Sequence, residues 1–213
     1  MNGVRTNTGR QIEPFGKMFD TLPKRALKRV GVVDVGSNSI RLVVFDGAAR
    51  SPAYFYNEKV MAGLGAEMAS TGRLNPAGVE RGFAALSRFA ALAKGMDIEP
   101  LTCVATAAVR EAEDGPDFQA RIERETGIRM WVIDGEEEAR LSAQGVLLGW
   151  PGANGLVCDI GGNSMELAEL KDGKVGRRAT SQLGPFRLQQ IKGGKDGLKA
   201  HIRSIMADLA QRM

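Results

Sequence analysis

The chain has 213 residues, which is long enough for one large or two small domains with cores. It has a formal net charge of +4 and the apolar fraction of a soluble globular protein. No apolar run approaches the roughly 18 residues that a membrane span needs, and the first thirty residues lack the apolar region of a secretory signal. We therefore expect a cytoplasmic protein without a membrane partner. A single histidine, His201, excludes His-based catalytic triads and His-rich metal sites.

The charge is distributed unevenly along the chain. Residues 1–30 hold seven Lys/Arg against two acidic residues, and residues 171–213 hold ten Lys/Arg against three Asp, so the segment between them is acidic. Basic ends around an acidic centre suit a polyanionic ligand held near carboxylates that bind metal. Solvated surface charge explains any single lysine better, and we expect no specific nucleic-acid partner.

The first element with a clear pattern follows a basic tail, residues 1–26. From Val30 to Phe45, two β-branched runs flank a polar loop, which predicts strand, tight turn and strand. The loop residues are small or tolerate positive φ, so consecutive backbone N–H groups can face one phosphate; they are Gly36, Ser37, Asn38 and Ser39. Asp34 beside that anion needs a cation, for which Mg²⁺ is the simplest choice. An ordinary hairpin turn is the alternative that this stretch leaves open.

The next segments predict an α/β unit. Residues 51–61 read as a third strand of an antiparallel meander, and residues 74–94 as a helix that Asn75-Pro76 begins. Residues 99–106 predict a buried strand. Arg110 follows its carboxyl end, where open α/β sheets bind ligands. A guanidinium there suits phosphate, although an ordinary surface arginine fits the position equally well.

A helix over residues 116–126 and a strand over residues 128–133 come next. A further helix over residues 136–148 then opens with Glu136, Glu137 and Glu138. Acidic residues in a first turn favour the helix dipole, but three in a row exceed what capping requires.

A repeat follows the connection at residues 151–155. Residues 34–42 align without a gap with residues 159–167, 125 positions later. That distance is too long for a solenoid and indicates two similar lobes, each presenting one anion-binding loop. The second loop is Gly161, Gly162, Asn163 and Ser164. We predict lobe I over residues 27–150 and lobe II over residues 151–213, with an antiparallel meander and later parallel strands joined by helical crossovers.

Five motifs in this order resemble the exopolyphosphatase and guanosine pentaphosphate phosphatase family, within the actin-like, ribonuclease-H-like ATPase superfamily. They are residues 34–39, 63–65, 105–110, 137–140 and 159–166. The resemblance implies an α/β, actin-like two-lobe fold with mixed sheets. Family members have a longer second lobe, so we interpret the chain as an N-terminal fragment with lobe II incomplete. Asn163 stands where the family usually has a third glycine.

The resemblance also implies the roles of the site residues. Glu138 would be the general base for the attacking water. Asp159 and Glu166, with Asp34, would hold Mg²⁺, and Arg110 would bind phosphate together with the two loops. The implied substrate is inorganic polyphosphate, guanosine pentaphosphate or both.

Two other functions are compatible with the pattern. One is a non-catalytic sensor of polyphosphate or guanosine nucleotides, against which Glu138 argues, and the other is an actin-like sugar or acetate kinase. As a fragment, the chain is expected to turn over slowly or not at all. We expect the uncovered sheet of lobe II to pack against a second copy, giving a homodimer, or to be disordered.

Overall fold

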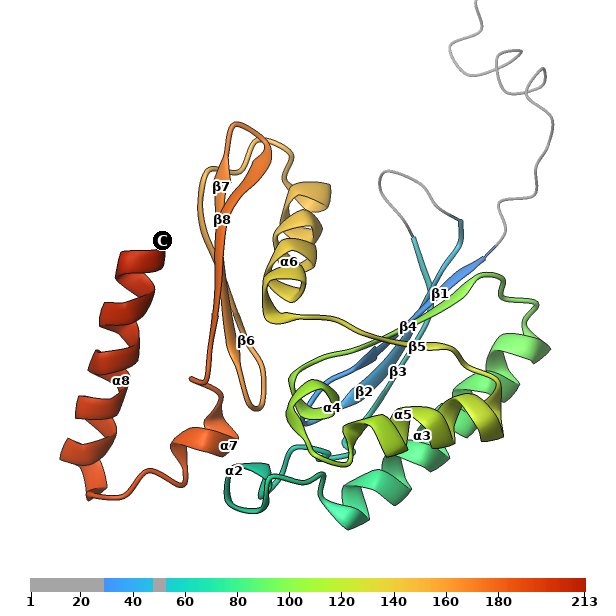
Figure 1. Ribbon diagram of the computed structural model, residues 1–213. Helices are drawn as coiled ribbons and strands as arrows, with labels where there is room; N and C mark the ends of the chain where they lie inside the picture. The colour runs from blue at the N-terminus through green and yellow to red at the C-terminus, as the bar shows by residue number, and fades with distance from the viewer. Residues whose placement is uncertain (1–28, 48–52) are drawn as a thin grey trace, which may run out of the picture.

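The computed structural model describes residues 29–47 and 53–213, and the tail predicted for residues 1–26 lies outside them. Two separate sheets form two lobes, with helix α6 between the sheets (Figure 1). No helix among the described residues has both the length and the apolar character needed to cross a membrane.

Lobe I contains a five-stranded mixed sheet in the order β3-β2-β1-β4-β5. The first three strands form an antiparallel meander, and β4 and β5 run parallel to β1, as the sequence predicted. The strands are β1 (Val30–Val35), β2 (Ile40–Phe45), β3 (Tyr54–Val60), β4 (Leu101–Ala105) and β5 (Met130–Val132).

The helices of lobe I pack their apolar faces against this sheet, and Figure 1 shows α3 and α5 side by side beneath it. Asn75 caps α3, because its Oδ1 accepts a hydrogen bond of 2.8 Å from the amide of Gly78. Gly127, at φ 72°, ends α5 in the left-handed conformation that glycine adopts most easily. The helices are α2 (Met68–Thr71), α3 (Pro76–Gly95), α4 (Ala107–Glu111) and α5 (Gly115–Thr126).

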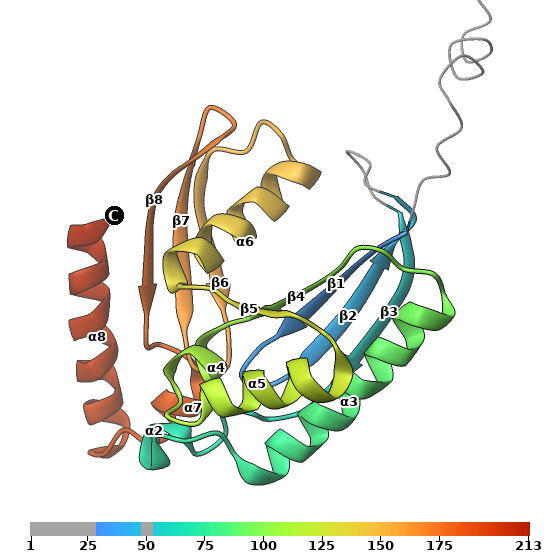
Figure 2. The same cartoon turned by 45° about the vertical axis from the view of Figure 1, so that its right-hand side comes forward.

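Lobe II has a three-stranded antiparallel sheet in the order β6-β7-β8. Helix α6 covers one face of the sheet and α8 the other, an arrangement that is clearest in Figure 2. Its elements are α6 (Gly135–Gly149), β6 (Gly155–Ile160), β7 (Met165–Lys171), β8 (Lys174–Ser181), α7 (Pro185–Leu188) and α8 (Gly194–Arg212).

The packing of α6 corrects the predicted boundary between the lobes. The sequence prediction placed this helix in lobe I, which was to end at residue 150. Its buried residues Ala139 and Ala143 instead pack against Ala168 and Leu170 of β7. The chain therefore passes between the lobes in the segment after β5, because the small alanine face of α6 fits closely onto the second sheet.

Strand β6 is an exposed edge. Among the described residues it pairs only with β7, and Leu156 and Ile160 on it are 59% and 61% exposed. An uncovered apolar stripe in lobe II agrees with the expectation of exposed sheet surface, although the strand itself is regular. Its coverage by a second copy stays a prediction.

Candidate functional site: two repeated loops around a cavity

The two repeated motifs adopt the same hairpin. The amide of Gly36 donates a hydrogen bond of 3.0 Å to the carbonyl of Ser39, and Gly161 donates one of 3.0 Å to Ser164. The flanking strands pair in the same register, since Asp34 lies opposite Arg41 and Asp159 opposite Glu166. The sequence repeat is therefore also a repeat of backbone structure.

The similarity continues to the exit of the third strand in each lobe. After β3, the amide of Gly65 donates to the carbonyl of Ser37 over 2.8 Å. After β8, the amide of Phe186 donates over 2.9 Å to the carbonyl of Gly162, which is the counterpart of Ser37 in the repeat. Each loop is thus held by its own hairpin and by the segment that leaves its lobe's third strand.

The two loops meet across the junction of the lobes. A Cβ atom placed on Gly162 would lie 3.0 Å from Cβ of Ser37, and one on Gly65 would lie 2.2 Å from Nδ2 of Asn163. Real Cβ atoms do not approach other atoms as closely as 2.2 Å, so the absence of a side chain at Gly65 allows this contact, and the 3.0 Å at Gly162 is also tight. Lobe I and lobe II are therefore in direct contact through the loops predicted to bind phosphate.

A cavity of about 390 Å³ lies between these loops. Its walls are polar, and both lobes contribute to them. The lining residues are Asp34, Gly36, Ser37, Asn38, Ser39, Lys59, Thr106, Glu138, Asp159, Ile160, Gly161, Gly162, Ser164, Pro185 and Phe186. Within the described residues, the amide groups of Ser37, Asn38 and Gly162 have no hydrogen-bond partner. Such backbone donors at a cavity can bind an anion.

Two aspartates face this cavity from opposite lobes. Desolvation by the surrounding protein raises the pKa of Asp34, and the negative charge of Asp159 raises it further, while Arg41 and Lys59 lower it. Asp159 accepts a hydrogen bond of 2.6 Å from the hydroxyl of Ser142 on α6. Two carboxylates that repel each other across a polar cavity are stabilised by a cation placed between them.

Glu138 lies in the first turn of α6. The N-cap of this helix is Asp134, whose Oδ1 accepts a hydrogen bond of 2.8 Å from the amide of Glu137. The Glu138 side chain is 15% exposed, and its Oε2 accepts a hydrogen bond of 3.1 Å from Nη1 of Arg110. Burial raises the pKa of Glu138, an effect that Arg110 and Thr106 partly offset and the charge of Asp34 reinforces. A carboxylate whose charged form is disfavoured is a stronger proton acceptor once ionised.

Glu166 lies on β7 opposite Asp159 and is only 2% exposed. Its pKa is raised to about 7, first by burial and then by the charges of Glu138 and Asp159, while hydrogen bonds with Thr180 and Ser164 act in the opposite direction. The hydroxyl of Thr180 donates to Oε1 of Glu166 over 2.8 Å. This carboxyl group therefore changes protonation near neutral pH.

The structure brings most of the predicted site residues together but not all of them. Ten line the cavity: Asp34, Gly36, Ser37, Asn38, Ser39, Glu138, Asp159, Gly161, Gly162 and Ser164. Arg110, Asn163 and Glu166 do not line it. Arg110 donates to Glu138 and, over 2.8 Å, to the carbonyl of Ile133, so its guanidinium is engaged with protein groups rather than open to a phosphate.

Asn163 was predicted to bind phosphate, and its position is a correction to that prediction. Its side chain is fully buried and turned away from the cavity, with Nδ2 at 3.5 Å from the carbonyl of Gly65 and 3.8 Å from Sδ of Met68. The loop after β3 covers it, because Gly65 leaves room there for the side chain. Its Oδ1 is buried without a hydrogen-bond partner in the described part of the chain.

Sequence reasoning missed five residues that line the cavity, of which Ile160 is the last residue of β6. Lys59 extends from β3 and forms no ion pair among the described residues, Thr106 follows β4, and Pro185 and Phe186 begin α7. Lys59 could have been noticed from the predicted meander. Asp34 on β1 lies opposite Arg41 on β2, and Arg41 lies opposite Lys59 on β3. No sequence signal indicated that the segment after β8 returns to the cavity.

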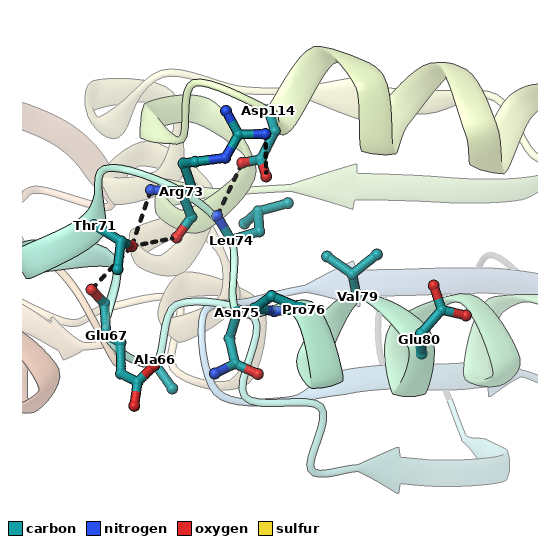
Figure 3. Close-up of a pocket in the computed structure, with 10 residues that line it drawn as sticks. All are labelled: Ala66, Glu67, Thr71, Arg73, Leu74, Asn75, Pro76, Val79, Glu80 and Asp114. Carbon is teal, nitrogen blue, oxygen red and sulfur yellow. Dashed lines mark hydrogen bonds and ion pairs between the residues drawn. The ribbon is translucent and has the colours of Figure 1, made fainter.

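A second cavity, of about 380 Å³, lies in lobe I among α2, α3 and the start of α5. Figure 3 shows that Arg73 there is directed at Asp114, and their ion-pair distance is 3.4 Å. None of the predicted site residues lines this cavity. Its arginine is already neutralised, so the cavity between the loops is the better candidate for an anionic ligand.

No three acidic, histidine or cysteine side chains among the described residues gather closely enough to hold a metal ion by themselves. Mg²⁺ commonly binds one or two carboxylates and completes its shell with water and substrate phosphates. Asp34 and Asp159 in the cavity fit that kind of site, whereas the hydrogen-bonded Glu166 suits an indirect contact through water.

Known proteins resemble this chain in sequence and in fold. The chain is 32% identical over 163 residues to Exopolyphosphatase 1 of Mycobacterium tuberculosis, an alignment covering 75% of this chain and 47% of that protein. An exopolyphosphatase structure from Cytophaga hutchinsonii matches with a TM-score of 0.71 and 29% identity, over 76% of this chain and 53% of that one. A Ppx/GppA structure from Aquifex aeolicus matches with a TM-score of 0.69 and 27% identity, over 86% and 62%.

The chain therefore spans about half the length of the curated relatives it matches. The actin-like two-lobe fold predicted from the sequence is confirmed by these structures, which the chain covers only in part. The model of the Ppx/GppA phosphatase family matches residues 43–212. With its repeated loops, its cavity and this match over most of its length, the chain belongs to the Ppx/GppA phosphatase family.

Proposed function

We propose that this chain forms the phosphate-cleaving site of a Mg²⁺-dependent exopolyphosphatase. It would release the terminal phosphate of inorganic polyphosphate, of guanosine pentaphosphate, or of both, by attack of a water molecule that Glu138 activates. The observation that carries the proposal is the meeting of both repeated loops and Glu138 in one polar cavity. The names of the curated relatives support polyphosphate as the substrate class.

In this proposal the two loops position the terminal phosphoryl group. Free amide groups on Ser37, Asn38 and Gly162 would donate to its oxygens from both lobes, and Lys59 would add a positive charge. Transfer of a phosphoryl group to water needs mainly correct positioning and neutralised charge, so no covalent nucleophile is required.

Glu138 would take the proton of the attacking water. Its raised pKa makes its carboxylate a better base than an exposed glutamate, and the contact with Arg110 keeps it oriented. When bound, Mg²⁺ would neutralise charge on the phosphate oxygens, and Asp34 and Asp159 would hold it, with Glu166 behind them.

The test is phosphate release from long-chain polyphosphate and from guanosine pentaphosphate, each with and without Mg²⁺. Glu138→Gln is expected to lower turnover by about 10²–10⁴-fold while leaving binding of inorganic tripolyphosphate intact, because general-base catalysis contributes on that order. Glu137→Gln is the matched control. Glu137 is the preceding residue and does not line the cavity. Its Oε2 accepts a hydrogen bond of 2.7 Å from Nε of Arg140.

The control is expected to keep turnover within about twofold, since such a pair on a helix surface contributes little. Equal turnover by the wild-type protein and Glu138→Gln would show that Glu138 is not the base. Tight binding of polyphosphate by the wild-type protein without any release would favour the non-catalytic sensor.

A further inference from the structure

A chain of alternating charges joins lobe II to the proposed base, and Arg187 is at its far end. Arg187 on α7 donates through Nη2 to Oε2 of Glu111 on α4. Oε1 of Glu111 lies 3.5 Å from Nη2 of Arg110, whose Nη1 donates over 3.1 Å to Glu138. The order is therefore arginine, glutamate, arginine, glutamate, and it crosses from lobe II to lobe I and on to α6.

Glu111 and Glu138 compete for the same guanidinium. Arg110 lies closer to Glu138 than to Glu111, at 3.1 Å against 3.5 Å, although Glu111 is its neighbour in sequence. A carboxylate without another partner attracts a nearby arginine strongly in a partly buried site. Because Arg187 already neutralises Glu111, Arg110 is available to Glu138.

The placement of Arg187 depends on contact between the lobes. The segment that carries it is fixed to the second phosphate loop by the hydrogen bond from the amide of Phe186 to Gly162. A Cβ on Gly184 would lie within 2.5 Å of backbone atoms of Asn163, so this segment sits directly on the loop. Arg187 therefore moves with that loop, and it reaches Glu111 only while lobe II is docked on lobe I.

The contacts of Arg187 require an arginine. Nη1 donates over 3.3 Å to the side chain of Gln182 while Nη2 donates to Glu111, and the whole side chain is only 19% exposed. Its Nε is buried and has no partner among the described residues. A lysine has one nitrogen and cannot reach both partners with the same geometry.

We infer that Arg187 is a positioning residue that, by holding Glu111, keeps Arg110 on Glu138 when the two lobes are docked. When the second phosphate loop docks on lobe I, the hydrogen bond between Arg110 and the proposed base Glu138 then forms. The inference rests on the proposed function for the part that Glu138 and Arg110 play in catalysis. The inference predicts that the contacts of Arg110 depend on Arg187, and this dependence can be measured without catalysis.

The first measurement is NMR of the Arg110 guanidinium in the ligand-free protein. Restricted rotation about the Cζ–Nη1 bond reports that Nη1 is held by Glu138 together with the carbonyl of Ile133. Arg187→Met keeps the apolar stem of the side chain, and we expect it to release this restriction as Glu111 draws Arg110 away. Adding Glu111→Gln removes the competing charge and is expected to restore it, which a purely structural role for Arg187 would not allow.

The second measurement is calorimetric binding of inorganic tripolyphosphate. Arg187→Met is expected to weaken binding by roughly tenfold, because Glu138 lines the cavity and repels the anion once Arg110 no longer neutralises it. Glu111→Gln in that background should recover most of the affinity. Arg177 and Glu169 form the matched control, since they make a 3.4 Å ion pair in lobe II and neither lines the loop cavity. Arg177→Met, alone and with Glu169→Gln, measures the effect of net charge alone.

An Arg110 signal that is unchanged in Arg187→Met would overturn the inference. So would a recovery by Glu111→Gln no larger than that produced by Glu169→Gln in the control pair. If the wild-type protein binds no tripolyphosphate, the proposed function fails, and the NMR measurement still decides whether Arg187 positions Arg110.

Discussion

The protonation of Glu166 makes the stability of the protein depend on pH in a defined direction. Its pKa is raised from 4.5 to about 7, first by burial and then by the charges of Glu138 and Asp159. The folded protein therefore holds this proton where the unfolded chain has lost it. The resulting stabilisation is fully present below pH 4.5 and is lost as pH rises through 7.

The size of this effect follows from the shift. About 2.5 pKa units correspond to about 3 kcal/mol of unfolding free energy, on the order of a third of the stability of a typical domain. Glu166→Gln removes the ionisation but retains an oxygen that can accept from the hydroxyl of Thr180. We expect the variant to match the wild-type protein at pH 4.5 and to be more stable by up to about 3 kcal/mol at pH 8.

Urea unfolding at a series of pH values, in EDTA to remove divalent cations, measures this difference. Glu169→Gln, on the same strand but more exposed, is the control and is expected to change stability by less than about 0.5 kcal/mol. A difference between wild type and Glu166→Gln that stays constant from pH 5 to 8, or a variant that is less stable at pH 8, would refute the reasoning.

Two further predictions concern the cavity and the contact between the lobes. Gly65→Ala places a Cβ 2.2 Å from Nδ2 of Asn163, so it is expected to separate the loops and weaken tripolyphosphate binding. Gly145→Ala is the control. Its new Cβ has no atom within 4 Å, so binding is expected to stay unchanged. Equal affinities of the two variants in calorimetry would contradict this. Lys59→Met is expected to weaken the same binding by roughly tenfold, as loss of one contact to a charged group does, and Lys59→Arg to retain most of it. An unchanged affinity of Lys59→Met would show that Lys59 does not contact the anion.

Much of the fold could be predicted from local sequence patterns. The start of α3 at Asn75-Pro76 and the end of α5 at Gly127 follow from capping chemistry that acts within a few residues, and the structure confirms both. The two hairpins could be predicted for the same reason. The lobe to which α6 belongs could not, because the buried Ala139 and Ala143 fit either sheet and only the three-dimensional packing selects one.

The candidate site shows the same limit. Most residues inside the repeated motifs could be located at the cavity from sequence, since the hairpins themselves fix their positions; Asn163 and Glu166 are the exceptions. Phe186 reaches the cavity through the exit of β8, and such a contact between distant segments leaves no periodic or spacing signal.

The two asparagines of the repeat show why an aligned residue need not keep its role. Asn38 and Asn163 occupy the same position in the gapless alignment, yet Asn38 lines the cavity and Asn163 is fully buried. The hairpins are alike, so the difference comes from what covers each loop. The segment at Gly65 crosses from lobe I onto the second loop and encloses Asn163. The repeat therefore supplies two similar loops, and the asymmetric contact between the lobes leaves Asn38 at the cavity and packs Asn163 against lobe I.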